Sequence, residues 1–373
     1  MKNLLTINPL LKNHVGLIAI VCVLAVLGTT YQYNTGGGIW LGKPLVHATR
    51  FCGLFLLMIL IANSSIIFWH TWAYHFYLIV LVLLMAVELA GFAGMGAKRW
   101  VNLYIFTLQP SEVMKVAVIL ALSKYYSDIN LEEQSFIWSG LLKRYAVPLF
   151  IITVPFFVVL KQPDLGTAAI IAGIGMFMML IVEKQPRRIF LCFLPAVLAL
   201  PFIWPMMHEY QKARILTFFN PEKYPFGSGY HIIQSKIALG SGGFLGKGFL
   251  MGTQSKLNFL PEKHTDFIFA TICEELGFLG GAAIILLYAF IVISGLKIAK
   301  KSGSRFGLLV SSGISVMFGL HAFINIGMVM GILPVVGIPL QIVSYGGSSM
   351  MTFMIALGVM LCVGLNKKTH IRP

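Results

Sequence analysis

The stretch LPEKHTDFIFATICEELGFLGGAAIILLYAFIVISGL, residues 260–296, places a polar opening directly before a long apolar run. The apolar run, 268–296, exceeds the about 20 residues with which a helix crosses a bilayer. Ionisable groups are rare inside such runs, and where they occur they often mark a functional site. Yet this stretch holds four of the chain's thirteen acidic residues: Glu262, Asp266, Glu274 and Glu275.

The composition shows that most of the chain is as apolar as this run. Hydrophobic residues occupy 58% of the 373 positions and charged residues 11%, with a mean hydropathy of +0.85. Globular domains carry about 25% charged residues, so this chain cannot bury its apolar surface in one water-soluble core. We expect an all-α polytopic membrane protein of about ten transmembrane helices. The apolar segments are 13–32, 46–67, 72–93, 111–125, 146–160, 166–182, 189–207, 268–296, 306–330 and 342–365.

Two of these segments, 111–125 and 146–160, are short, so either could be tilted or re-entrant. The net charge of +15 follows the expected topology, because the short segments on one side of the membrane hold most of the Lys and Arg residues that flank the spans. The positive-inside rule then places both termini in the cytoplasm. We therefore expect no nucleic-acid partner and a single membrane domain, residues 1–373.

One long polar segment interrupts the spans. Residues 208–266 would form a glycine-rich extracytoplasmic loop before the eighth span, and a loop of this length is more often functional than idle. Its stretch GSGGFLGKG, residues 240–248, fits neither a P-loop nor a dinucleotide-binding fingerprint, because the glycine spacing fails for both. The apolar residues of 232–239 predict a short amphipathic helix within the loop.

The role of Asp266 has two interpretations at this point. We expect a helix to begin near Thr265, with Asp266 in its first turn at the outer rim of the membrane. The carboxylate could simply complement the positive end of that helix, an effect of about 0.3–1 kcal/mol. Alternatively, burial in a cavity could raise its pKa to that of a usable general base. Glu262 and His264 could bind a cation beside it.

Glu274 and Glu275 lie deeper along the same helix, where a charge must be neutralised, paired or hydrated. Lys115 is a candidate partner in an internal ion pair. It also lies three residues after Glu112, a spacing that places both side chains on one face of a helix. The alternative is a polar cavity lined by both helices.

Further polar residues fall on the expected outer face. Lys98 and Arg99 in GAKRW are cations on the side where the charge rule leaves few, which favours an anionic ligand such as a lipid phosphate. Asp164 in KQPDLGT either caps the next helix or faces the same site. The segment GILPVVGIPLQIVSYGGSSM, which includes Ser344, breaks the helical pattern, and irregular backbone at membrane depth is tolerated mainly where it lines a cavity or is buried in protein.

Many separate segments, in order along residues 15–365, together resemble the SEDS family of bacterial cell-wall polymerases, and most closely its RodA, rod-shape-determining branch. These segments are GAKRW, QPSE, QPDLGT, GYHIIQSKIALGSGG, GTQSKL, LPEKHTDFIFA, EELG, NIGMVMGILPVVGIPL and SYGGS.

The resemblance implies a peptidoglycan glycosyltransferase that polymerises lipid II into glycan strands at the periplasmic face of the bacterial cytoplasmic membrane, for cell elongation and rod shape. It implies ten transmembrane helices and a class B penicillin-binding protein as the transpeptidase partner. Two other functions remain open, namely a flippase for the lipid-linked precursor and a noncatalytic scaffold for a cell-wall synthase.

Site residues follow from the same resemblance. Asp266 matches the family's essential aspartate and would act as general base on the acceptor hydroxyl. A divalent cation, Mg or Mn, could bind at Glu262 and His264. We expect contacts with lipid II or the nascent strand from Lys98, Arg99, Lys247 and Ser344. Glu112, Lys115 and Asp164 match cavity residues of the family and either bind the substrate as well or shape the cavity.

Overall fold

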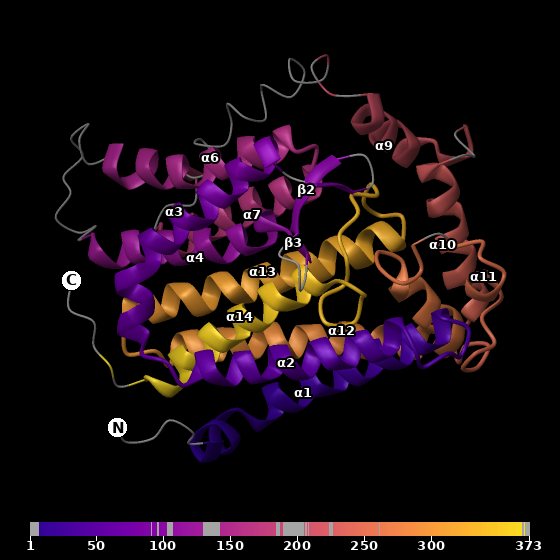
Figure 1. Ribbon diagram of the computed structural model, residues 1–373, viewed down its shortest axis with the longest axis horizontal. Helices are drawn as coiled ribbons and strands as arrows, with labels where there is room; N and C mark the ends of the chain where they lie inside the picture. Colours follow the sequence, from indigo (N-terminus) through magenta and orange to yellow (C-terminus); the bar gives the residue numbers. More distant parts are fainter. Residues whose placement is uncertain are drawn as a thin grey trace.

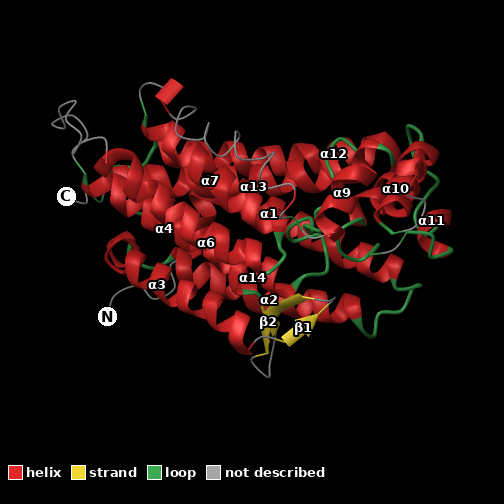
Figure 2. Cartoon of the chain, turned by 90° about the horizontal axis from the view of Figure 1, so that it is seen from above, coloured by secondary structure: helices red, strands yellow, loops and turns green. Residues whose placement is uncertain are grey.

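The structure is a computed structural model and describes residues 7–90, 92–94, 97–102, 107–129, 142–183, 209–223, 227–260 and 262–367, with positions 187, 188, 205, 207 and 369. Long helices lie side by side in a bundle, as Figures 1 and 2 show. The helices are α1 (Ile7–Thr35), α2 (Lys43–Ala62), α3 (Ile66–Ala90), α4 (Pro110–Asp128), α6 (Val147–Lys161), α7 (Leu165–Val182), α9 (Glu209–Phe219), α10 (Ser228–Gly242), α11 (Thr253–Lys256), α12 (Ile268–Lys300), α13 (Arg305–Val329) and α14 (Gly347–Leu365).

The prediction of a polytopic helical membrane protein is confirmed. Within the described part of the chain, eight helical segments are long and apolar enough to cross a membrane, and they correspond to eight of the expected spans. The short run at 146–160 belongs to one of them, because the π-helical turn η1 (Leu142–Ala146) precedes α6 directly. The expected span 189–207 lies outside the described residues, apart from positions 205 and 207.

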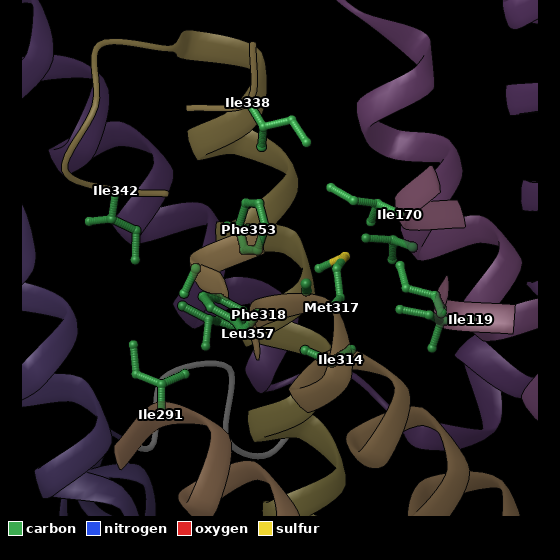
Figure 3. Packing of buried hydrophobic residues seen from close by; sticks show 14 of the residues in the cluster. Ile119, Ile170, Ile291, Ile314, Met317, Phe318, Ile338, Ile342, Phe353 and Leu357 are labelled. Carbon is green, nitrogen blue, oxygen red and sulfur yellow. The ribbon is translucent and has the colours of Figure 1, made fainter. Parts of the chain in front are cut away.

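Helix α4, which covers the second short run, differs from the spans by being enclosed. Every residue from Pro110 to Ser123 is buried, and the helix packs against α3, α7 and α13. Its surroundings are therefore protein on all sides, which explains why a helix of such modest hydropathy can lie in the bundle. The core continues between α13 and α14, where Phe318 and Phe353 meet edge to face at 4.5 Å between ring centroids (Figure 3).

A small antiparallel sheet is an addition to the expected all-α fold. Strands β1 (Phe92–Gly94), β2 (Ala97–Asn102) and β3 (Thr107–Leu108) lie in the order β1-β2-β3, with Ala93 opposite Lys98. The stretch GAKRW thus lies largely on a strand rather than in a loop. The sheet joins α3 to α4 and carries Arg99 to the polar cavity described below.

The long polar segment before α12 is mostly helical. It contains α9, the 3-10 turn η3 (Pro221–Lys223), α10 and α11, which gather at one end of the bundle (Figure 1). The helix expected around 232–239 is α10. The segment after α13 has no helix from Gly331 to Gly346, in agreement with the prediction of irregular backbone there.

Helix α12 differs from its prediction in two ways. It begins at Ile268, so Asp266 lies in the preceding turn and not in the first helical turn. It also breaks at Gly277, whose φ of 66° is left-handed. The loop after α10 fills the break: the Lys247 and Gly248 amides donate to the carbonyls of Glu274 and Glu275 at 3.1 and 3.0 Å. The interrupted backbone groups are therefore satisfied by protein.

Candidate active site

A polar cavity of about 220 Å³ lies between the sheet, the α6–α7 turn, the turn before α12 and the segment between α13 and α14. Four carboxylates line it, together with the guanidinium of Arg99 and several hydroxyl groups. The carboxylates are those of Glu112, Asp164, Glu262 and Asp266. The structure thus brings together five of the residues that the sequence singled out.

Asp266 is held at the cavity by its backbone. Its carbonyl accepts a hydrogen bond from Asn325 Nδ2 at 2.9 Å, and the same amide donates to the carbonyl of Ile338 at 2.6 Å. Ser344 Oγ donates to the neighbouring carbonyl of Thr265 at 2.6 Å. Helix α13 and the segment after it therefore fix the turn that carries Asp266, and Ser344 acts here as a support and is not part of the cavity lining.

The Asp266 carboxylate itself remains available. Among the described residues it receives no hydrogen bond, although its side chain is partly enclosed. Burial, together with the negative charge of Glu262 and against the opposing charge of Arg214, raises the pKa of Asp266 to about 7. A carboxylate whose pKa lies near neutrality can accept a proton efficiently at physiological pH.

Glu112 and Lys115 form the ion pair that their spacing predicted, with 2.8 Å between Oε1 and Nζ. Glu112 lines the cavity, whereas Lys115 is fully buried behind it and also contacts His321 Nε2 at 2.8 Å. The proposed pairing of Lys115 with Glu274 or Glu275 is wrong, because both acids have other partners. The i, i+3 pair forms because α4 alone sets its geometry.

Asp164 combines both of its expected roles. Its Oδ1 accepts from the Thr167 amide at 3.1 Å and so caps α7, while its Oδ2 accepts from Gln109 Nε2 at 3.0 Å at the cavity. Arg99 donates from Nε to the carbonyl of Gln162 at 2.8 Å and from Nη2 to the carbonyl of Pro163. Arg99 therefore ties β2 to the α6–α7 turn while it faces the cavity. The Lys98 side chain lies outside the described part.

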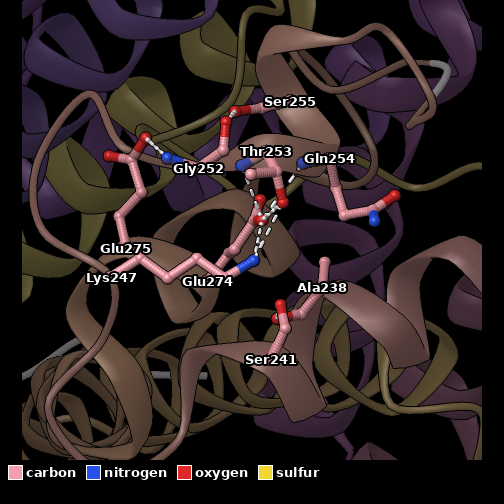
Figure 4. Close-up of polar contacts among 9 residues, drawn as sticks. All are labelled: Ala238, Ser241, Lys247, Gly252, Thr253, Gln254, Ser255, Glu274 and Glu275. Carbon is pink, nitrogen blue, oxygen red and sulfur yellow. Dashed lines mark hydrogen bonds and ion pairs between the residues drawn. The ribbon is translucent and has the colours of Figure 1, made fainter.

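Glu274 and Glu275 belong to a separate cluster, shown in Figure 4. Glu274 Oε1 lies 2.7 Å from Lys247 Nζ and accepts from the amides of Thr253 and Gln254 at 2.8 and 3.0 Å. Glu275 accepts from the Gly252 amide at 3.3 Å and from Asn34 Nδ2. These acids hold the glycine-rich loop against α12. Lys247 is the partner of Glu274 and does not line the cavity, so its position gives no support to a role in substrate binding.

Glu262 and His264 do not form a common cation site. Glu262 lines the cavity and accepts from Thr265 Oγ1 at 2.9 Å, whereas His264 Nδ1 lies 2.8 Å from Thr35 Oγ1 at α1. Burial, with the charges of Lys43 and Lys263, lowers the pKa of His264 to about 4. No group of three His, Cys, Asp or Glu residues suited to a metal ion occurs among the described residues.

Sequence reasoning missed three residues around the site. Asn325 lies in the quoted stretch NIGMVMGILPVVGIPL but received no role, and its clamp on Asp266 depends on a contact across 59 residues. His321 and Arg214 carried no local signal either. Arg214 on α9 donates to the carbonyl of Val336 at 3.2 Å and brings a positive charge toward Asp266.

The fold and the cavity define a class: a multi-pass α-helical membrane protein with a carboxylate-lined site near one end of its spans. The family model described as "Cell cycle protein", which covers FtsW, RodA and SpoVE, matches residues 3–369. The chain belongs to this family, and the resemblance drawn from its motifs is confirmed.

Named relatives agree with this assignment. The chain is 40% identical over 314 residues to "Peptidoglycan glycosyltransferase MrdB" of Escherichia coli strain K12, covering 84% of this chain and 83% of the relative. It is 36% identical over 368 residues to "Stage V sporulation protein E" of Bacillus subtilis strain 168, covering 96% of each.

Solved structures show the same fold. One chain from a study titled "Structural coordination of polymerization and crosslinking by a peptidoglycan synthase complex" matches with a TM-score of 0.79 at 28% identity, covering 96% of this chain and 99% of that one. The crystal structure of Thermus thermophilus rod shape determining protein RodA matches with a TM-score of 0.70 at 24% identity, over 96% and 99% of the two chains.

Proposed function

We propose that this protein is a peptidoglycan glycosyltransferase that polymerises lipid II into glycan strands at the periplasmic face of the cytoplasmic membrane, for cell elongation and rod shape. The activity class is that of the relative with 40% identity. The observation that carries the proposal is Asp266, a carboxylate without a hydrogen-bond donor among the described residues, at a polar cavity and with a pKa of about 7.

Asp266 acts as the general base of the transfer. It removes the proton from the acceptor sugar hydroxyl while that oxygen attacks C1 of the donor sugar. The bond from C1 to the oxygen of the lipid pyrophosphate breaks, and the pyrophosphate leaves with both bonding electrons. A sugar hydroxyl is a weak nucleophile, so a base of matched pKa within hydrogen-bond reach accelerates the step by about 10²–10⁴-fold.

The departing pyrophosphate requires positive charge near it. Arg99 lines the cavity, and Lys98 precedes it on the same strand, so both are assigned to the pyrophosphate. Glu112 and Asp164 offer acceptors for the sugar hydroxyls and peptide of lipid II. Lys115, which is enclosed, acts by keeping Glu112 in place.

A divalent cation, Mg or Mn, stays a proposal without a defined site. When bound it would supply positive charge to the pyrophosphate, but the described residues around Glu262 and His264 do not converge on one ion.

The remaining assignments concern location and partner. Both termini are assigned to the cytoplasm and the cavity to the periplasmic face of the cytoplasmic membrane, an assignment that the charge distribution supports. A class B penicillin-binding protein is the expected partner, which would crosslink the strands. Support comes from the fold shared with a chain of a peptidoglycan synthase complex.

The experiment is polymerisation of labelled lipid II by purified protein, alone and with the transpeptidase. We expect glycan strands from wild type, none from Asp266→Asn, and normal strands from Glu209→Gln, which changes an exposed acid outside the cavity. Polymer from Asp266→Asn at the normal rate would reject the base assignment. Absence of polymer from wild type under every condition would favour a flippase or a scaffold.

A further inference from the structure

A second cavity, also of about 220 Å³, lies at the opposite end of the bundle from the glycine-rich loop. It is formed by the start of the α1 span, the last turns of α12 and the residues after α14. Three lysines line it together with the partly apolar wall of the two spans. These lysines are Lys297, Lys301 and Lys367.

The three ammonium groups have no acidic neighbour in the segments that form the cavity. The sequence contains no Asp or Glu before Glu88 and none after Glu275. Within the described part of the chain, the hydrogen bonds and ion pairs include none from these three side chains. Three like charges around one hollow repel one another unless an anion lies between them.

The lysines of α12 converge on the cavity because of their spacing. Phe290, Ser294, Lys297 and Lys301 follow at intervals of four, three and four residues, which is one face of a helix. Lys297, Lys300 and Lys301 are all exposed, but Lys300, in the same last turn, does not line the cavity. The positive-inside rule and the negative end of a helix explain why lysines occur in this turn. They do not explain why the lysines converge on one cavity.

The wall of the cavity opposite these lysines consists of packed side chains and is not merely open surface. His14 lines the cavity and is only 9% exposed. Its ring lies against Gly364 of α14, where an added Cβ would come within 2.7 Å of Nε2. Leu17 and Phe290 add an apolar wall from the two spans. The site therefore offers cations beside a surface that can face acyl chains.

We propose that this cavity binds the phosphate-bearing headgroup of an anionic phospholipid in the cytoplasmic leaflet. The cavity volume of about 220 Å³ is several times the volume of about 30 Å³ that one water molecule occupies. A phosphodiester therefore has room in the cavity. Basic pockets between helices on the cytoplasmic side suit such headgroups. The bound lipid links α1, α12 and the end of α14. The choice of leaflet rests on the proposed orientation.

The test compares thermal unfolding of the purified full chain in detergent with added phosphatidylglycerol, phosphatidylcholine or inorganic phosphate. Phosphatidylglycerol raises the Tm of wild type, whereas phosphatidylcholine and free phosphate leave it unchanged. The combined variant Lys297→Gln, Lys301→Gln and Lys367→Gln loses the rise, and each single change lowers the affinity for the lipid roughly fivefold. Lys300→Gln, the matched control, keeps the full rise.

An equal rise in Tm in the triple variant and in wild type would overturn the proposed lipid site. If Lys300→Gln loses as much of the rise in Tm as the change of any cavity lysine does, the site is overturned too, because net charge alone would then explain binding. Stabilisation by free phosphate equal to that by phosphatidylglycerol would overturn the assignment to a lipid. Polymerisation of lipid II is a separate readout, so failure here leaves the proposed enzymatic function untouched.

Discussion

The cavity of Asp266 and the cluster of Glu274 use carboxylates from one short stretch in opposite ways. Glu274 accepts bonds from Lys247 and from two backbone amides and is fully buried. Asp266 is anchored through its carbonyl, and within the described part of the chain its carboxylate receives no hydrogen bond and so remains available to the cavity. A carboxylate held by a cation and backbone amides stabilises structure, whereas one that receives no hydrogen bond keeps the capacity to bind or to take a proton.

The largest expected difference between the two regions is in activity for each folded molecule. Asp266→Asn lowers the rate of lipid II consumption by about 10²–10⁴-fold with little change in Tm. Glu274→Gln lowers the free energy of unfolding by about 2–4 kcal/mol, since Lys247 loses its counter-charge, while the folded fraction keeps near-normal activity. Rate assays and thermal unfolding of both variants measure these changes in activity and stability. Equal loss of activity in both variants would show that Asp266 and Glu274 do not differ in role.

The glycine-rich loop offers a stability test of the cluster around Glu274. In Gly246→Ala an added Cβ would lie 2.0 Å from the Glu275 carbonyl oxygen at a φ of 82°, so the loop must leave the break in α12. We expect a loss of about 3 kcal/mol in the free energy of unfolding.

Gly240→Ala is the matched control for this change. Gly240 lies in α10 and an added Cβ there meets nothing within 4 Å. Because alanine is the better helix former, stability should rise by about 0.5–1 kcal/mol. Similar Tm values for the two variants would show that the loop does not depend on its close approach to α12.

The smallest expected effect concerns the pH profile of kcat/KM. Asp266 must be ionised to act as a base, so activity rises as pH increases through about 7. Glu262→Gln removes a negative charge that raises this pKa, so the rise should begin at a lower pH, by less than about one unit. Glu222→Gln, an exposed acid outside the cavity, should leave the midpoint in place. A midpoint that moves upward in Glu262→Gln contradicts the proposed electrostatics.

Local patterns predicted much of the fold and part of the site. Apolar runs indicated the spans that are described, and the i, i+3 spacing predicted the pair of Glu112 and Lys115. Such features depend on neighbours along one helix, whose geometry is fixed by backbone hydrogen bonds. The motifs alone identified the family and singled out Asp266.

Long-range contacts could not be predicted in the same way. Lys247 reaches Glu274 across 27 residues, and Lys115 meets His321 across 206. The break in α12 at Gly277 forms only because the loop after α10 satisfies the interrupted backbone. No spacing rule covers these contacts, since each depends on how separate helices pack.

By itself the sequence determined that this protein lies in a membrane and roughly where most of its spans run, because hydropathy acts locally, and its resemblance to a known family singled out one acid for chemistry. Tertiary structure alone decided which carboxylates are paired with distant groups and which line a cavity. The physical reason is that hydrogen-bond partners and burial are supplied by segments far apart in the chain, and these two conditions set whether a buried acid serves structure or reaction.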